Sequence, residues 1–253
     1  DEINHFRAQL ADIRDGGKPG CGSRPVILQL QHVLEDRKAA LCLRDLELSG
    51  KADAVLPGGE GVPETVEIGQ QMQCRRSLLA EAAIGLAEEL LKTGAQLAVS
   101  ARSREPLEAL ALRYPGRVLV VPGDLTDALQ VREIGKRIAQ AWGALDTAIL
   151  NAGTCEYIDV QQFDATLIER VLSSNLLSAS YCIEAALPLL RAGNRPHLVG
   201  VASSVTYLPL PRAEAYGASK AGLRYLFESL RIDLAVEGLD VTIIRPGVVE
   251  TPL

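Results

Sequence analysis

A tyrosine and a lysine four residues apart have the clearest capacity for chemistry in this 253-residue chain. Tyr216 and Lys220 begin a helical pattern, so their side chains lie on one helix face, one turn apart. A free phenol has a pKa of about 10 and is a poor acid or base at neutral pH. A neighbouring ammonium lowers that pKa, as proton transfer to or from a substrate oxygen requires. Taken alone, the pair could equally lie on a solvated helix face.

Two serines precede this pair at a compatible distance. Ser203 and Ser204 follow the apolar run His197–Ala202 and stand 13 and 12 residues before Tyr216. A hydroxyl at the carboxyl end of a buried parallel strand faces the crevice in which such sheets bind ligands. There it could donate a hydrogen bond to a reacting carbonyl. The alternative is a pair of ordinary turn residues.

The elements that must position these groups have the pattern of a parallel α/β sheet. After about Leu90, runs that are apolar on both faces alternate with helix-period stretches, as in βαβ units. Right-handed crossovers between such strands give a Rossmann-like, doubly wound sheet flanked by helices. The expected strands are Gln96–Ser100, Arg117–Val121, Thr147–Leu150, His197–Ala202 and Val241–Ile244. The expected helices are Ala87–Lys92, Glu105–Tyr114, Leu129–Trp142, Phe163–Arg191 with a possible break, and Tyr216–Glu237.

Residues 1–75 lack this alternation. They contain glycine-rich breaks at Gly16–Gly22 and Gly58–Gly61 and one apolar run, Pro25–Leu34. We assign no function to this N-terminal segment. The dinucleotide-binding domain is therefore predicted to cover residues 76–253.

Composition narrows the class of protein. A net charge of −6 with interspersed signs argues against a nucleic-acid-binding surface, which needs a basic patch. The five cysteines are scattered and form no CxxC pair, which argues against a zinc site or a disulfide framework and fits a reducing cytoplasm. No apolar run is long enough to span a bilayer, so we expect a cytoplasmic protein without a membrane partner.

The residues around Tyr216 resemble the active-site signature of short-chain dehydrogenase/reductases. Ser-Ser is followed by Pro-x-x-x-x-Tyr-x-Ala-Ser-Lys, and the resemblance covers roughly residues 84–253. Four further motifs occur in the order of the family. They are Gly123–Leu125 after the third family strand, Leu150–Gly153 in place of NNAG, Asn175 at the position of the family's asparagine, and Pro246–Thr251 in place of PGxVxT.

The resemblance implies a role for each of four side chains. Tyr216 would be the general acid/base, and Lys220 would lower its pKa and bind the nicotinamide ribose. Asn175 would anchor a proton relay through water. The family's usual spacing of 13 residues nominates Ser203 to orient the substrate oxygen, whereas alignment of the strand nominates Ser204. We prefer Ser204, because a strand fixes side-chain direction and a one-residue slip reverses it.

The resemblance also implies a dinucleotide cofactor. At the end of the second strand an acidic residue favours the ribose 2′-OH, and an arginine favours the 2′-phosphate. Ser100 and Arg102 occur there without an acidic residue, which favours NADP(H) over NAD(H), although Arg102 could also be a plain surface arginine. No metal ligand is expected. The expected cofactor-binding residues are Gly85, Ser100, Arg102, Asp124, Leu125, Asn151, Ala152, Gly153, Tyr216, Lys220, Pro246, Gly247, Val249 and Thr251.

The glycine-rich phosphate loop of the family, TGxxxGIG, is missing. Its expected place reads Ser77–Leu86, where only Ile84-Gly85 matches and Glu81 would set a negative charge near the phosphates. Codons can be written for Phe-Thr-Gly-Gly-Ser-Ser-Gly that, read one base later, give Leu-Leu-Ala-Glu-Ala-Ala, which is residues 78–83. Our hypothesis is that the sequence upstream of Ile84 is out of frame or a fusion. Because the chain stops at Leu253, we also expect the family's substrate-covering segment and last strand to be missing from the fold.

Two functions are compatible with these observations. The first is an NAD(P)-dependent oxidoreductase that transfers a hydride between NADP(H) and a small alcohol or carbonyl substrate. The second is a catalytically inactive dinucleotide-binding or scaffold protein, which the altered glycine loop favours. Homo-oligomers are typical of the family, although the tail that often forms their interface is not expected here.

Overall fold

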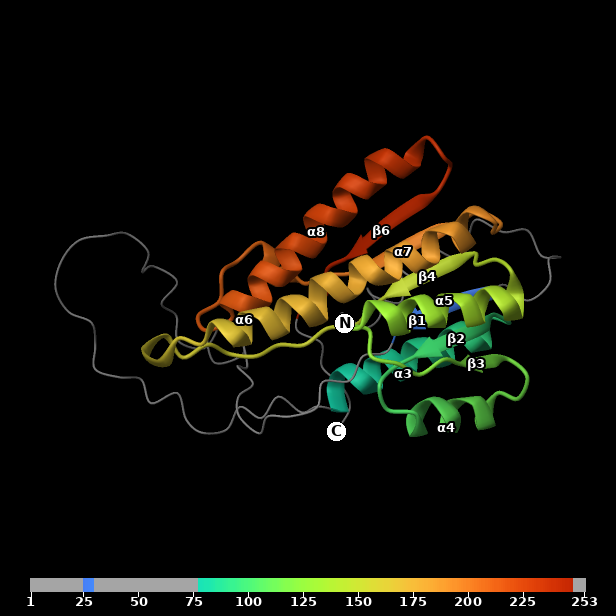
Figure 1. Cartoon of the computed structure of the whole chain (residues 1–253), viewed down its shortest axis with the longest axis horizontal. Coiled ribbons are helices and arrows are strands. Elements are labelled where there is room, and N and C mark those ends of the chain that lie inside the picture. The colour runs from blue at the N-terminus through green and yellow to red at the C-terminus, as the bar shows by residue number, and fades with distance from the viewer. Residues whose placement is uncertain (1–24, 30–76, 248–253) are drawn as a thin grey trace. The chain divides into compact units, whose positions relative to one another are not determined.

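The computed structural model describes residues 25–29 and 77–247 (Figure 1). Its centre is a parallel sheet in the order β3-β2-β1-β4-β5-β6, so the predicted Rossmann-like, doubly wound fold is confirmed. The strands are β1 Pro25–Gln29, β2 Gln96–Ser100, β3 Val118–Val120, β4 Thr147–Leu150, β5 His197–Val201 and β6 Asp240–Ile244.

Helices connect the strands in the predicted order. Every predicted element after residue 90 begins and ends within two residues of its expected bounds, but the first helix begins ten residues earlier than expected. The possible break in the long helix is a π-helical segment. The helices are α3 Ser77–Lys92, α4 Glu105–Arg113, α5 Ala128–Trp142, α6 Ala165–Leu172, α7 Ser178–Arg191 and α8 Glu214–Ala235, with short segments η1 Val160–Gln162, η2 Ser173–Leu177 (the π-helix) and η3 Ser204–Thr206.

Strand β1 is the largest departure from the sequence analysis, which gave it no place in the sheet. It pairs in parallel with β2 on one side and β4 on the other, with Ile27 opposite Ala98 and Ala148. A five-residue apolar run has no periodicity that distinguishes a buried strand, and residues 30–76 separate it from α3. The dinucleotide-binding fold therefore includes a strand from within residues 1–75.

The two faces of the sheet are covered by different helices. Successive side chains of a strand point to opposite faces. Accordingly, Val26 and Leu97 pack with buried residues of α3 and α4, whereas Ile27 and Ala98 pack with α5, α7 and α8 (Figure 1). The result is a three-layer arrangement with one apolar core on each side of the sheet.

Small residues set how closely the helices approach. A Cβ added at Gly200 of β5 would lie 2.6 Å from the buried ring of Phe227, so only glycine lets α8 pack at this distance. A Cβ at Gly135 of α5 would lie 3.1 Å from Ala185 of α7. The contact at Gly200 matters for function because it fixes α8, which carries Tyr216 and Lys220, against the sheet.

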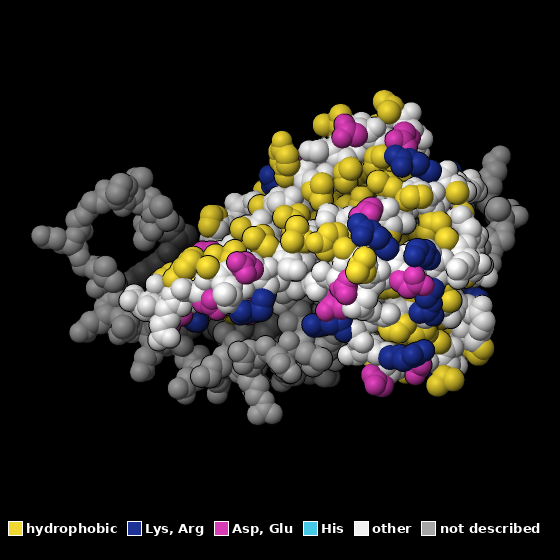
Figure 2. Space-filling view, in the orientation of Figure 1, with side chains coloured by type: hydrophobic (Ala, Val, Ile, Leu, Met, Phe, Trp, Pro, Cys, Tyr) yellow, Lys and Arg dark blue, Asp and Glu magenta, His cyan; other side chains and the backbone are white. Residues whose placement is uncertain are grey.

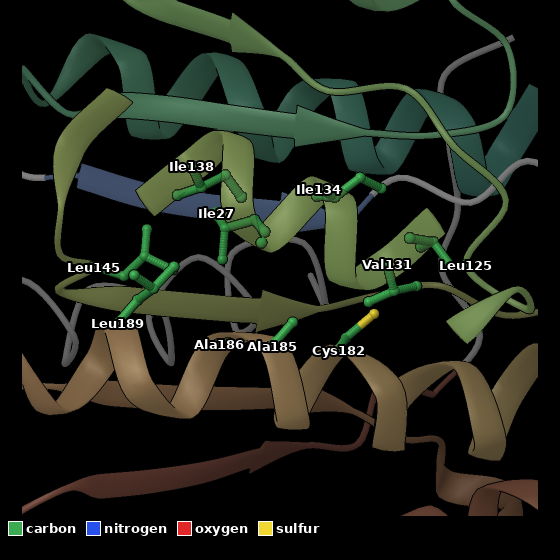
Figure 3. A pocket seen from close by; sticks show the side chains of 11 residues that line it. Ile27, Leu125, Val131, Ile134, Ile138, Leu145, Cys182, Ala185, Ala186 and Leu189 are labelled. Atoms are coloured by element: carbon green, nitrogen blue, oxygen red, sulfur yellow. The ribbon is translucent and has the colours of Figure 1, made fainter. Parts of the chain in front are cut away.

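A small cavity lies between the sheet, α5 and α7 (Figure 3). Its volume is about 10 Å³, which is room for one water at most, and its walls are hydrocarbon apart from the Cys182 thiol. A water there would lack polar partners, so the cavity is a packing void and not a ligand site. Its walls are formed by Ile27, Leu125, Val131, Ile134, Gly135, Ile138, Leu145, Cys182, Ala185, Ala186 and Leu189.

Hydrophobic side chains gather along α7 and between α7 and α8 on the face shown in Figure 2. Ile232 in α8 and Val236, which directly follows α8, are also exposed, and they are 75% and 91% accessible. None of the helices in residues 77–247 is both long and apolar enough to cross a membrane.

Candidate active site

The predicted site residues meet at the carboxyl edge of the sheet. All the strand pairs are parallel, so the carboxyl ends of the strands lie along one edge. Ser100 ends β2, Asp124 follows β3 and Asn151 follows β4. Ser203 follows β5 and Pro246 follows β6. Ligands of such sheets bind outside this edge, so the arrangement forms a candidate active site.

Asn175 joins three of the elements that surround the site. It lies in the π-helix η2 and is fully buried. Its Oδ1 accepts a hydrogen bond from the amide of Thr154 at 2.6 Å, and its Nδ2 donates to the Thr154 carbonyl at 2.8 Å. The same Nδ2 donates to Ser219 Oγ on α8 at 2.8 Å, and that hydroxyl donates to the carbonyl of Tyr216 at 2.7 Å. The amide therefore ties the turn after β4 to the helix that carries the tyrosine.

Lys220 lies beside this network. Its side chain is buried, its Nζ donates to the carbonyl of Val201 at 2.8 Å, and it stands 6.0 Å from the centre of the Tyr216 ring. A Cβ at Gly153 would lie 3.1 Å from Nζ and 3.3 Å from Asn175 Oδ1. Glycine at this position therefore leaves room for both side chains.

Burial lowers the pKa of Lys220 from 10.5 to about 8, and nearby Cys155 partly opposes the shift. Between these two pH values the unfolded chain binds more protons than the folded protein, so raising the pH stabilises the fold. We expect wild type to gain about 3 kcal/mol in unfolding free energy relative to Lys220→Met between about pH 7.5 and 10.5. Urea unfolding of both proteins across this range measures the difference, because other titrating groups cancel. If the unfolding free energies of the two proteins change with pH in parallel, the pKa of Lys220 is not lowered in the folded protein.

The two serines differ in their hydrogen bonds. The Ser203 hydroxyl accepts from the amide of Val205 at 3.2 Å and thereby caps η3. The Ser204 amide donates to the carbonyl of Pro246 at 3.0 Å, and its side chain is exposed at the carboxyl edge. Tyr216, in the first turn of α8, is half-buried. Ser203 is thus engaged within its own turn, whereas Ser204 faces solvent.

The ends of β2 and β3 present the residues predicted to contact adenosine. Ser100 is fully buried, and its Oγ has no hydrogen-bond partner among the described residues. Arg102 is exposed two residues later. The carboxylate of Asp124 accepts hydrogen bonds from the amide and hydroxyl of Thr126 at 2.9 and 2.8 Å, while Leu125 is buried in the core. Both Ser100 and Arg102 therefore lie at the carboxyl end of β2, where they were predicted to bind the cofactor.

The phosphate end of the predicted site differs from expectation at Gly85. This glycine lies within α3, eight residues after the helix begins at Ser77. The backbone amides at the N-terminus of the helix, which would bind a phosphate, are therefore not at Gly85. A Cβ there would meet nothing within 4 Å. Val249 and Thr251 were also predicted to contact the cofactor and lie outside the described residues. The remaining predicted contacts, Asn151, Ala152, Gly153, Pro246 and Gly247, lie at the carboxyl ends of β4 and β6.

Three contributors escaped the sequence analysis. Thr154 holds Asn175 through its backbone, and Ser219 links Asn175 to Tyr216. The carbonyl of Val201 accepts from Lys220. Thr154 directly follows the NNAG-like motif, and Ser219 lies inside the Tyr-x-Ala-Ser-Lys signature, so both residues lie in or beside motifs that the sequence analysis identified. Contacts made by backbone atoms do not depend on the residue type, so the sequence does not reveal them. Among residues 25–29 and 77–247, no three His, Cys, Asp or Glu side chains gather as a metal site would require.

Comparisons with known proteins agree with this arrangement. The chain is 33% identical over 187 residues to an 11-beta-hydroxysteroid dehydrogenase-like protein of Arabidopsis thaliana, which covers 70% of this chain and 59% of that relative. The chain thus spans less than two thirds of that relative's length.

Solved structures show the same fold. A short-chain dehydrogenase from Streptomyces avermitilis superposes with a TM-score of 0.66 at 18% identity, over 91% of this chain and 68% of that one. The RhlG/NADP active-site complex of Pseudomonas aeruginosa gives 0.63 at 28% identity, over 68% and 69%. The family model described as short chain dehydrogenase matches residues 80–253, which is more than half of the sequence. The chain therefore belongs to the short-chain dehydrogenase family.

Proposed function

We propose that this chain is an oxidoreductase that transfers a hydride between NADP(H) and an alcohol or carbonyl substrate. The observation that carries the proposal is the buried connection of Asn175, Ser219 and the Tyr216 backbone, with Lys220 beside the Tyr216 ring, at the carboxyl edge of the sheet. Asn175, Tyr216 and Lys220 are among the residues to which the family resemblance gives a role. A relative named as 11-beta-hydroxysteroid dehydrogenase-like and a solved NADP complex support the reaction class.

In this proposal each side chain has a defined task. The nicotinamide would supply or accept the hydride at the substrate carbon. Ser204 would donate a hydrogen bond to the substrate oxygen, and Tyr216 would give or take its proton. Lys220 would favour the phenolate form of Tyr216 through its charge and would hold the ribose. Asn175 would anchor the water through which the proton reaches solvent.

Binding and turnover test this function directly. NADPH fluorescence should change on binding, and a screen of ketones and alcohols with both cofactors should find a substrate. Absence of binding at millimolar NADPH would instead favour the second candidate, a catalytically inactive relative. The position of Gly85 inside α3, with no glycine-rich loop at that point, is the observation that favours this alternative.

We further propose that Arg102 selects NADP(H). A guanidinium forms charge-assisted hydrogen bonds with a phosphate, and loss of such bonds costs about 1.5–3 kcal/mol. Arg102→Ala should therefore weaken NADPH binding by roughly 10- to 100-fold, with little change for NADH. Arg104→Ala is the matched control, because it removes an exposed guanidinium that lies farther along the chain from the end of β2, next to the start of α4. Equal losses for NADPH and NADH would refute the assignment.

Three further proposals concern the whole protein. The hypothesis that the sequence upstream of Ile84 is out of frame or a fusion is narrowed by β1, which belongs to the sheet, so the change would lie between β1 and Ile84. A nucleotide sequence in which no single-base shift restores a glycine-rich loop would refute this. The exposed side chains of Ile232 in α8 and of Val236, which directly follows α8, support a homo-oligomer, which sedimentation would detect. The scattered cysteines support a cytoplasmic location.

A further inference from the structure

One exposed aromatic side chain lies close to two cations. The ring of Tyr207 has the guanidinium of Arg224 at 5.3 Å from its centre, and that of Arg245 at 5.3 Å as well. Both distances are within the range at which a cation is attracted to the face of an aromatic ring. Tyr207 is 60% accessible, so its ring contributes little to the apolar core. Packing in the core therefore does not explain why the ring lies beside two guanidinium groups.

The three stacked residues come from three different elements, and each element carries part of the candidate site. Tyr207 follows η3, which begins at Ser204. Arg224 belongs to α8, two turns beyond Tyr216. Arg245 follows β6 and directly precedes Pro246, one of the residues predicted to bind the cofactor. The contacts of Tyr207 therefore join the segment η3, which begins at Ser204, helix α8, which carries Tyr216, and the end of strand β6.

Hydrogen bonds transmit the position of Tyr207 to Ser204. The amide of Tyr207 donates to the carbonyl of Ser204 at 3.0 Å, and the amide of Ser204 donates to the carbonyl of Pro246 at 3.0 Å. Displacement of the ring would thus loosen both ends of the turn that holds the Ser204 hydroxyl.

A carboxylate holds the two cations in place. Glu228 Oε1 lies 3.6 Å from Arg224 Nε and 3.9 Å from Arg245 Nη1. The Nε of Arg224 is buried and has no hydrogen-bond partner among the described residues. The aromatic face of Tyr207 is therefore an important contact for this guanidinium, beside the distant carboxylate.

We infer that Tyr207 is a positioning residue for the proposed reaction. The contacts of its ring with Arg224 and Arg245, which we call the clamp, set the Ser204 hydroxyl at the distance from Tyr216 that lets both groups reach one substrate oxygen. The inference rests on the proposed function. A displacement of about 1 Å at a reacting group can reduce turnover up to 100-fold, so a clamp outside the site can control the rate.

The test compares variants that keep or remove the aromatic face. Tyr207→Leu should lower kcat about tenfold, with NADPH affinity and Tm close to wild type. It should also speed hydrogen exchange of the Ser204 amide by about tenfold, because the bond to Pro246 opens more often. Tyr207→Phe keeps the ring and should restore both values. Phe163→Leu removes an equally accessible aromatic side chain that is not part of the stack and should change neither.

The outcomes separate the inference from the proposed function. Wild-type turnover with an unchanged kcat in Tyr207→Leu would overturn the inference alone. If wild type shows no turnover with any substrate, the proposed function fails, and the exchange rate of the Ser204 amide still decides the clamp. Faster hydrogen exchange of the Ser204 amide in Tyr207→Leu but not in Tyr207→Phe supports the inference. Equal exchange rates in wild type and Tyr207→Leu overturn it. A loss of kcat in Tyr207→Phe would assign the effect to the hydroxyl and also overturn it.

Discussion

Replacement of Tyr216 by phenylalanine should lower kcat about 10³-fold and change NADPH affinity less than about threefold. The substitution removes one oxygen and leaves the ring, so the 6.0 Å approach of Lys220 to the ring can persist. The proposed reaction needs a group that exchanges a proton with the substrate oxygen, and phenylalanine has none. Steady-state kinetics together with fluorescence titration of NADPH separate turnover from binding.

The control for this prediction lies on the same helix. Tyr225 is 74% accessible on α8, so Tyr225→Phe removes a hydroxyl from the same helix without touching the candidate site. Its turnover should equal that of wild type. Retention of more than about a tenth of the activity in Tyr216→Phe would contradict the acid/base role.

Replacement of Asn175 by alanine should destabilise the fold by about 3 kcal/mol. The side chain satisfies the amide and carbonyl of Thr154 and also bonds Ser219, all in the buried interior. Alanine leaves these groups without partners and opens a cavity, and each unsatisfied buried polar group costs about 1–3 kcal/mol. Chemical denaturation of wild type and variant measures the difference.

Deletion of a hydroxyl on the same helical run tests whether the effect is specific to Asn175. Ser180 on α7 donates only to the carbonyl of Leu177 at an exposed site, so Ser180→Ala should change stability by less than about 0.5 kcal/mol. If Asn175→Ala unfolds at nearly the same denaturant concentration as Ser180→Ala, the amide does not hold the site together.

Much of the fold was predictable because the strands have a strong local signal. Gln96–Ser100 and Thr147–Leu150 were predicted with the bounds that the structure gives them, since both are apolar runs between helical patterns. The position of the candidate site followed from the strand order, because parallel strands end at one edge. The spacing of Tyr216 and Lys220 likewise determined that both lie on one face of a helix.

Other features depend on contacts that no local pattern encodes. Strand β1 is recognised only by its partners, β2 and β4, which lie far along the chain. The early start of α3 at Ser77 was missed for a different reason. The helix-forming residues from Ser77 onward were interpreted as a replaced phosphate loop. The π-helical turn at Ser173–Leu177 turns Asn175 inward, and sequence periodicity shows only that a break is possible there.

The central place of β1 has a consequence for the order of folding. Without it, β2 with β3 and β4 with β5 and β6 would be two separate sheets, each with an unpaired edge. Strand β1 pairs with strands that lie far along the chain, and the entropy of bringing such distant residues together must be met before the pairing contributes. We therefore expect β1 to join late, after the two halves have formed. Until then the open edges of β2 and β4 would be the sites of self-association, so refolding yield should fall as protein concentration rises.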